Sequence, residues 1–173
     1  MSQHFFKYHL DIDNTKLLQK CYDILKSDLS VTTTVGDEIA LYNKSRTATY
    51  NRVTTFPFAN SHKETNPHTW EEFKPVADFL KTLPNFTKIS KSWLGLALKG
   101  SSLGSHVHKT EHSVFIYYVN INESHPPTRF FINNEWVSFP TISGDCVYFA
   151  NNILHDVPVN TGTEDRIVIT VDI

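Results

Sequence analysis

Short runs of β-branched and aromatic residues alternate with turn-forming residues through the second half of the chain, and this pattern limits the folds that it can adopt. Turn residues such as Pro126-Pro127, Asn133-Asn134 and Ser143-Gly144 separate the runs. Short strands at this regular spacing indicate an antiparallel sandwich or barrel. The expected strands are residues 89–98, 113–121, 128–132, 135–139, 145–150, 156–159 and 166–172.

The first half contains two helical patterns of apolar residues. Residues 14–29 carry them at helical spacing, and residues 69–83 begin with a capping-box pattern at Thr69. Two short strands, 39–42 and 48–56, are expected between the helices. The predicted fold class is therefore mostly β with flanking helices (α+β), with the helices packed outside a β barrel.

The length of the chain fits one domain. A chain of 173 residues is long enough to remove roughly 70% of its unfolded surface from water. No internal repeat, low-complexity tract or linker divides the sequence. We expect a single domain, 1–173, in which residues 1–88 form a supporting region of helices and strands and residues 89–173 form the β core with the functional site.

Charge and hydropathy argue against two classes of partner. The chain has 18 acidic and 16 basic residues and no run of Lys or Arg, so no binding surface for a nucleic-acid backbone or an anionic membrane is expected. It has no signal-peptide pattern and no apolar stretch of about 18 residues.

Two distant cysteines, Cys21 and Cys146, indicate reduced, packed thiols. These features predict a cytoplasmic protein.

The segment SHVHKTEH, residues 105–112, contains three of the nine histidines. Alternate residues of a strand point to one face, so His106 and His108 are expected about 6.6 to 6.8 Å apart along a strand. Such a pair can bind a metal ion, but histidines also serve as buried or solvated polar residues. A metal site needs a third ligand, and His155, which follows an apolar run, is the candidate.

Arg166 begins the apolar run RIVITVDI, eleven residues after His155. A guanidinium among apolar residues is costly unless an anion meets it, and its parallel N–H groups suit a carboxylate. The alternative is an arginine on an edge strand, in solvent or paired with Asp172 or Glu164. The order of His-x-His, His and Arg favours the carboxylate-binding interpretation.

These residues in this order resemble the Fe(II)- and 2-oxoglutarate-dependent oxygenases. The resemblance extends over residues 89–173 and is closest to the prolyl-hydroxylase-like branch and to small oxygenases of phages. It implies a double-stranded β-helix, which is a jelly-roll or cupin-like barrel, and a location in the cytoplasm of the host cell if a phage encodes the chain. The matching segments are His106-Val107-His108, Ile116-Tyr117-Tyr118-Val119-Asn120, His155-Asp156-Val157-Pro158 and Arg166-Ile167-Val168-Ile169-Thr170-Val171.

The resemblance also implies a role for each residue. Arg166 and Tyr118 would hold the far carboxylate of the co-substrate 2-oxoglutarate, and Thr170 would place a hydroxyl near the metal from the same face as Arg166. The implied reaction is hydroxylation of an unactivated C–H bond with release of succinate and CO2, and no catalytic residue beyond the metal centre is expected. The implied ligands of Fe(II) are His106, His108 and His155.

One ligand departs from the family pattern. Where the family has Asp or Glu, this chain has His108. Three neutral ligands leave the charge of the ion less compensated, so Zn, Ni or Cu are alternatives to Fe(II). Asp156 is expected to point away from the site because strand neighbours face opposite sides. Glu111 and His112 have no assigned role.

Two other functions fit part of the pattern. A cupin-type dioxygenase with three histidine ligands would use no 2-oxoglutarate and would leave Arg166 and Tyr118 without a role. A non-catalytic metal-binding β-barrel module would hold no ion, or a structural ion with Glu111 or His112 as a fourth ligand.

The loops are expected to select the substrate, which is a small molecule or a peptide. Peptidyl proline, a free amino acid and a nucleotide are all compatible with the sequence. The candidate substrate contacts are Arg46, Asn51, Arg52 and Arg129.

Overall fold

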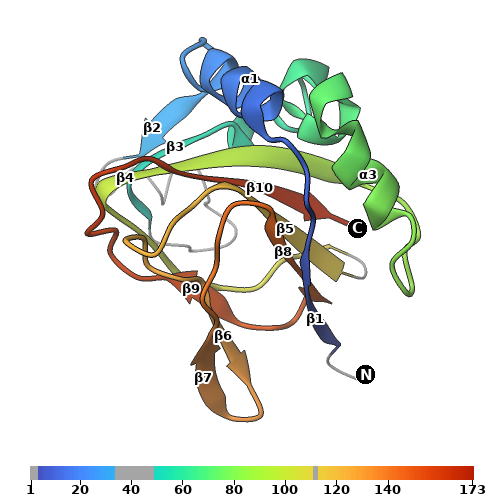
Figure 1. Cartoon of the computed structure of the whole chain (residues 1–173), viewed down its shortest axis with the longest axis vertical. Helices are drawn as coiled ribbons and strands as arrows, with labels where there is room; N and C mark the ends of the chain where they lie inside the picture. The colour runs from blue at the N-terminus through green and yellow to red at the C-terminus, as the bar shows by residue number, and fades with distance from the viewer. Residues whose placement is uncertain (1–3, 34–48, 111–112) are drawn as a thin grey trace.

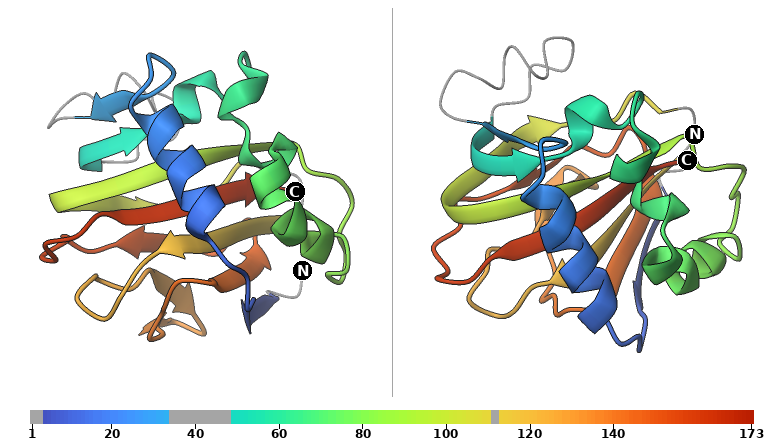
Figure 2. Two further views of the ribbon diagram at one scale, coloured as in Figure 1. Left: turned by 45° about the horizontal axis from the view of Figure 1, so that its top comes forward. Right: turned by 90° about the horizontal axis from the view of Figure 1, so that it is seen from above.

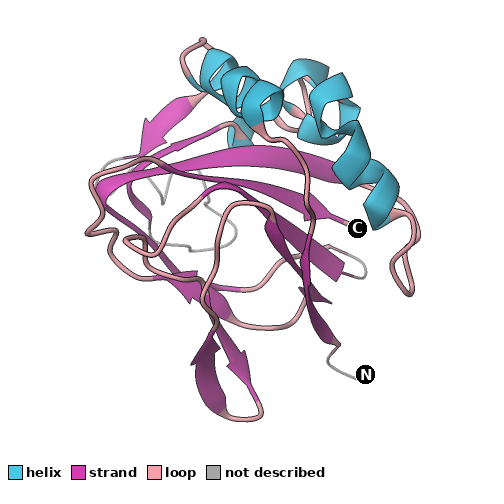
Figure 3. Cartoon of the chain, in the orientation of Figure 1, coloured by secondary structure: helices cyan, strands magenta, loops and turns pink. Residues whose placement is uncertain are grey.

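The β-rich runs form one sheet of ten strands that curls on itself, in the part of the chain that the structure describes (Figures 1 and 3). The structure is a computed structural model that describes residues 4–33, 49–110 and 113–173. The strands are β1 (Phe5–His9), β2 (Val31–Thr33), β3 (Thr49–Thr54), β4 (Lys91–His106), β5 (Ser113–Asn120), β6 (Arg129–Ile132), β7 (Glu135–Ser138), β8 (Asp145–Ala150), β9 (His155–Val157) and β10 (Arg166–Asp172).

Neighbouring strands within these ranges all pair antiparallel. The main path runs β1-β8-β5-β10-β4-β9-β6-β7, and β3 pairs with β4 and β2. The long strand β4 therefore joins three neighbours: β10 along its first half, β3 along its middle and β9 at its end. This strand joins the β1-β8-β5-β10 part of the sheet to the β9-β6-β7 part. Its last residue, His106, is the first histidine of the histidine segment.

Both faces of the sheet are apolar, and alternation along β10 shows why. Ile167, Ile169 and Val171 belong to an outer core cluster together with helix residues such as Leu17. Val168 belongs to a separate inner cluster with Val114, Ile116, Tyr118, Phe130, Val147 and Phe149. Successive side chains of a strand face opposite sides. Arg166, Val168, Thr170 and Asp172 consequently share the inner face, which carries the candidate site.

Two helices cover the outer face of the sheet, α1 (Thr15–Leu25) and α3 (Lys74–Leu80) (Figure 2). No helix in the described ranges is long and apolar enough to cross a membrane. Four short 3-10 turns accompany them: η1 (Phe56–Phe58), η2 (Lys63–Thr65), η3 (Pro67–Thr69) and η4 (Glu71–Phe73).

The helix expected at residues 69–83 is shorter than predicted, and its start was wrong. The backbone of Trp70 is extended, with φ −85° and ψ 144°, and separates two 3-10 turns. The α-helix therefore begins only at Lys74. The Thr69 hydroxyl donates backward to the carbonyl of Asn66 at 2.9 Å instead of capping the helix. The helix starts where Pro75 can occupy its first turn, because a missing N–H costs nothing there.

The predicted fold class, mostly β with flanking helices, is confirmed. The strands expected at 145–150 and 166–172 have those bounds in the structure. Strand β4 continues eight residues beyond the predicted end at 98, to His106. Strand β1 was not predicted, and the strand expected at 39–42 lies outside the described residues.

The two cysteines are free thiols, as predicted. Cys21 and Cys146 are both buried in the outer core cluster. Burial raises the pKa of the Cys146 thiol to about 12. Both side chains therefore serve as packed, unreactive core residues.

Candidate metal centre

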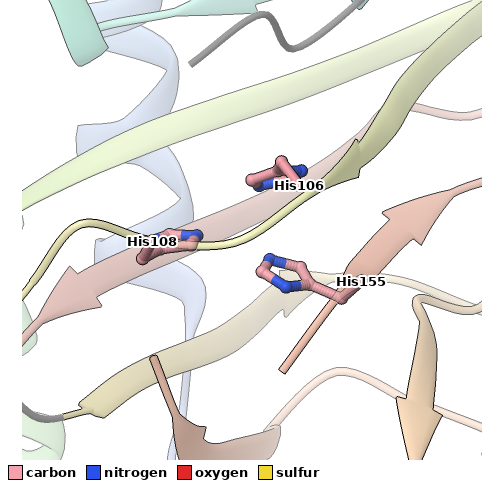
Figure 4. Close-up of side chains that lie close together, drawn as sticks. All are labelled: His106, His108 and His155. Carbon is pink, nitrogen blue, oxygen red and sulfur yellow. The ribbon is translucent and has the colours of Figure 1, made fainter. Parts of the chain in front are cut away.

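Three histidines meet on the inner face of the curled sheet. One ring nitrogen of each of His106, His108 and His155 lies within 4.8 Å of the others, and Figure 4 shows the three rings turned toward one another. His106 ends β4 and His155 begins β9, where the two residues pair directly across the strands. The predicted ligands are therefore brought together in a cluster that could hold one metal ion.

The local structure differs from the predicted strand pair in one respect. Strand β4 ends at His106, so His108 lies just beyond it, with its backbone N–H bonded to the carbonyl of Asn151 at 3.1 Å. An irregularity in register between Leu103 and His106 also interrupts the ladder with β9. Bulges of this kind re-aim side chains next to functional sites.

Hydrogen bonds fix which nitrogen each histidine presents. The Nδ1 atoms of His106 and His155 lie 2.8 and 3.0 Å from the carbonyl oxygens of Gly104 and Ile153. A carbonyl oxygen only accepts, so each Nδ1 carries the hydrogen and each Nε2 keeps its lone pair. Nδ1 of His108 faces a carboxylate instead. All three rings thus present Nε2 to a common point, as metal-binding histidines do.

Two of the histidines are held in the neutral form that binds a metal. Burial, together with the nearby His108 and Arg52, lowers the pKa of His106 to about 4. Burial and the two neighbouring histidines also bring the pKa of His155 well below its ordinary value. The rings of Phe130 and Phe149 lie 5.9 and 5.0 Å from that of His155. This apolar environment favours an uncharged imidazole at neutral pH.

Arg166 and Tyr118 lie together in the interior. The guanidinium carbon of Arg166 is 5.6 Å from the centroid of the Tyr118 ring. The hydroxyl oxygen of Thr128 accepts a hydrogen bond from Nη2 of Arg166 at 3.0 Å and another from the Tyr118 hydroxyl at 2.9 Å. The structure therefore joins the two residues expected to bind a carboxylate, through a threonine that the sequence did not indicate.

The charge of Arg166 is buried and uncompensated within the described residues. Its side chain is 1% exposed, and its Nε atom forms no hydrogen bond there. Burial lowers the pKa of Arg166 to about 10, so the group stays cationic at neutral pH. The alternative of an edge-strand arginine is wrong, because β10 lies between β5 and β4. Asp172 and Glu164 bond to His108 and Asn122 instead.

A second arginine reaches the same face. Arg52 and Arg166 pair with Ala97 from its two sides, so all three side chains share the inner face. Arg52 is 5% exposed. Two buried guanidinium groups thus lie on the inner face that also carries the three histidines.

The other candidate substrate contacts are placed differently. Arg129 donates two hydrogen bonds to Asp156, at 2.8 and 2.7 Å, and lies over the Trp136 ring. Asp156 thus points away from the histidines, as predicted. Arg46 lies outside the described residues, and the side chain of Asn51 is likewise not described.

Trp93 and Thr170 line the inner face near the histidines. The Trp93 ring stacks on that of His108, with centroids 5.6 Å apart and planes 19° apart. Thr170 pairs with Trp93 and Ile116 and is 7% exposed. A role for its hydroxyl at the metal stays a prediction. Glu111 and His112, the alternative fourth ligands, lie outside the described residues.

The sequence interpretation missed Thr128 and Asp172. Asp172 shares the face of Arg166 because the two are six residues apart on one strand, and this spacing could have identified it. Thr128 follows Pro126-Pro127, which carries no comparable signal.

The chain matches known proteins in its three-dimensional structure but not in its sequence. No protein-family model and no curated protein matches the sequence. Among solved structures, a prolyl hydroxylase from Trichoplax adhaerens, in complex with a peptide of the oxygen degradation domain of hypoxia inducible factor, has a TM-score of 0.67 at 13% identity. The match covers 97% of this chain and 82% of that one.

Two further structures are similar. A prolyl-4-hydroxylase from Pseudomonas putida has a TM-score of 0.65 at 11% identity over 97% of this chain and 91% of its own. The epimerase SnoN, in complex with Fe3+, alpha-ketoglutarate and nogalamycin RO, has a TM-score of 0.62 at 14% identity over 96% and 77% of the two chains. Combined with the three-histidine cluster, these matches identify the architecture. The chain has the double-stranded β-helix fold of the prolyl hydroxylases and other 2-oxoglutarate/Fe(II) oxygenases.

Proposed function

We propose that the chain is a 2-oxoglutarate-dependent oxygenase that binds its metal ion through His106, His108 and His155. The observation that carries this proposal is the buried guanidinium of Arg166, which has no anionic partner among the described residues and shares the inner face with the three histidines. A buried cation without an anionic partner is costly, so such a site favours an anionic ligand. A dicarboxylate that also chelates the metal satisfies both features.

In this proposal, different residues of the inner face bind the two ends of 2-oxoglutarate. Arg166 and Tyr118 bind the far carboxylate, and Thr128 orients both of them. Because the Thr128 oxygen already accepts two hydrogen bonds, its own hydroxyl hydrogen is left for the same carboxylate. Trp93, which stacks on His108, and Thr170, which pairs with Trp93, lie near the end of 2-oxoglutarate that would chelate the metal. O2 would be the oxidant, with one oxygen atom going to the substrate and the other to succinate, and a bound metal ion would bring O2 and 2-oxoglutarate together. The protein would position them in an apolar interior.

The metal is Fe(II) in this proposal, and its three imidazole ligands are also acceptable to Zn, Ni and Cu. The solved structure of SnoN contains Fe3+ and alpha-ketoglutarate, which supports iron and 2-oxoglutarate for this fold. The reaction that we propose is hydroxylation of a C–H bond, in line with the two prolyl hydroxylases. The substrate is a small molecule or a peptide; the T. adhaerens prolyl hydroxylase has a peptide in its complex.

A cupin-type dioxygenase without 2-oxoglutarate is the alternative that the three histidines favour. It leaves the Arg166–Thr128–Tyr118 group without a function, although this group is completely buried and costly to maintain. We therefore prefer the 2-oxoglutarate-dependent reaction.

The proposed organisation is a single domain over residues 1–173. It is supported by the contributions of the first 88 residues to the core, since β1 extends the sheet at β8 and α1 packs on the outer face. A cytoplasmic location and a relation to the phage oxygenases stay predictions.

The test is an anaerobic titration of Fe(II)-loaded protein with 2-oxoglutarate, followed through the visible metal-to-ligand charge-transfer band. We expect the band in the wild type, its loss in His155→Ala and a weaker affinity in Arg166→Lys, which keeps the charge but loses the two parallel N–H groups. Arg129→Lys is the matched control, because Arg129 binds Asp156 outside the site. Bound iron without any band would reject the proposal in favour of the cupin-type alternative.

A further inference from the structure

Asp172 is a buried carboxylate in direct contact with the candidate metal centre. It ends β10, is 4% exposed, and its Oδ1 atom lies 2.7 Å from Nδ1 of His108. Its Oδ2 atom lies 3.7 Å from Nζ of Lys91, which is a longer and more exposed contact. The strongest partner of Asp172 in the described chain is therefore His108.

This contact makes His108 different from the other two histidines. The Nδ1 atoms of His106 and His155 donate to neutral carbonyl groups, whereas that of His108 donates to a carboxylate. Trp93 stacks on the ring of His108 and restricts its rotation. His108 is thus held in one orientation, with Nε2 toward the cluster and a full negative charge behind the ring.

The position of this difference is informative. His108 stands where the family resemblance implies an acidic ligand. The carboxylate of Asp172 lies behind it, with Oδ1 at 2.7 Å from Nδ1 of His108. A carboxylate bonded to the distal nitrogen of a metal-binding histidine orients the ring and makes the other nitrogen more basic. The same charge would also offset part of the positive charge of the ion.

We propose that Asp172 is a positioning residue that supplies, through His108, the negative charge that an acidic ligand would bring directly to the metal. The inference rests on the metal site of the proposed function but not on the use of 2-oxoglutarate. Asp172 and His108 then act as one unit, an anionic ligand assembled from two side chains. This unit would let a set of three histidines compensate part of the charge of a divalent ion.

The test measures metal affinity in the absence of 2-oxoglutarate. Co(II) is titrated into metal-free protein in competition with a chromophoric chelator, and the visible absorption of the bound Co(II) reports its coordination. We expect Asp172→Asn to weaken binding about 10- to 100-fold and to shift the Co(II) spectrum. Asp172→Glu should recover part of the affinity. Asp145→Asn, which changes a buried carboxylate bonded to His9, a histidine outside the cluster, should leave the affinity unchanged.

A second experiment, with the same Co(II) titration, distinguishes a role of Asp172 in supplying charge through His108 from a purely structural role. In a His108→Asp background the carboxylate ligand is present directly, and Asp172 becomes a like charge beside it. The charge of Asp172 would no longer act through an imidazole there, so Asp172→Asn should weaken Co(II) binding much less than it does in the wild type. A purely structural role predicts the same loss of affinity in both backgrounds.

The outcomes distinguish the two proposals. Wild-type affinity in Asp172→Asn, or an equal loss of affinity in both backgrounds, would overturn the role of Asp172 and leave the oxygenase proposal standing. Tight Co(II) binding with a smaller loss in the His108→Asp background, but no charge-transfer band with 2-oxoglutarate, would reject only the oxygenase. Wild-type protein that binds no metal would reject both.

Discussion

The guanidinium of Arg52 lies directly over Gly95: a Cβ atom at Gly95 would lie 2.0 Å from Nη2 of the arginine. Gly95 belongs to β4, and Arg52 to the neighbouring strand β3. The missing side chain therefore allows a long charged residue to cross the strand and enter the interior. Any larger residue at position 95 competes with Arg52 for the same space.

Gly95→Ala should lower the free energy of unfolding by about 1–3 kcal/mol, the usual cost of overpacking a core. Arg52→Ala removes the clash, so Gly95→Ala should be neutral or stabilising in that background, because alanine suits a strand interior better than glycine. Denaturant unfolding of the four proteins gives the coupling. Equal costs in the two backgrounds would show that Arg52 does not occupy the space above Gly95.

Thr128→Val should weaken 2-oxoglutarate binding about tenfold, because Arg166 and Tyr118 lose the shared oxygen that orients them. Metal affinity should not change, since Thr128 does not contact the histidines in the described structure. Titration of the charge-transfer band and of Co(II) measures the two quantities. Thr141→Val is the control, because the hydroxyl of this half-buried residue bonds the backbone carbonyl of Phe139, two residues before it. A parallel loss of metal affinity would contradict the assigned role.

The metal-free protein should lose stability as the pH falls from about 6.5 toward 4. The pKa of His106 is lowered from 6.5 to about 4 in the folded state, and that of His155 is lowered as well. In this window the unfolded chain binds more protons than the folded one, so acid favours unfolding. Denaturant unfolding across the range measures the slope, and His106→Gln should reduce it. A slope unchanged in that variant would place the titrating group elsewhere.

Removal of a bound metal should lower the melting temperature. A ligand that binds only the native state stabilises it by about 2.7 kcal/mol at 100 times its dissociation constant. Thermal unfolding with Ni(II), and then with excess chelator, should show a reversible rise and fall of the melting temperature. His155→Ala should abolish the rise, whereas His125→Gln, a histidine bonded to the backbone at Glu164 and remote from the cluster, should retain it.

Some features of the fold were predictable because they depend on local chemistry. The alternation of RIVITVDI predicts a strand with a polar inner face at Arg166 and Thr170, and β10 has those bounds. The helix expected at 69–83 failed at its start, because the extended backbone of Trp70 reflects packing rather than the capping-box pattern.

The sequence by itself determined the fold class and identified His106, His108, His155 and Arg166 as candidates for one site, because strand alternation and the order of these residues are properties of the chain alone. Only the tertiary structure decided how these residues are supported. Asp172 reaches His108 across 64 positions of sequence, and Thr128 reaches Arg166 across 38. Such contacts depend on the register between distant strands and on the space between their side chains, which no local pattern specifies.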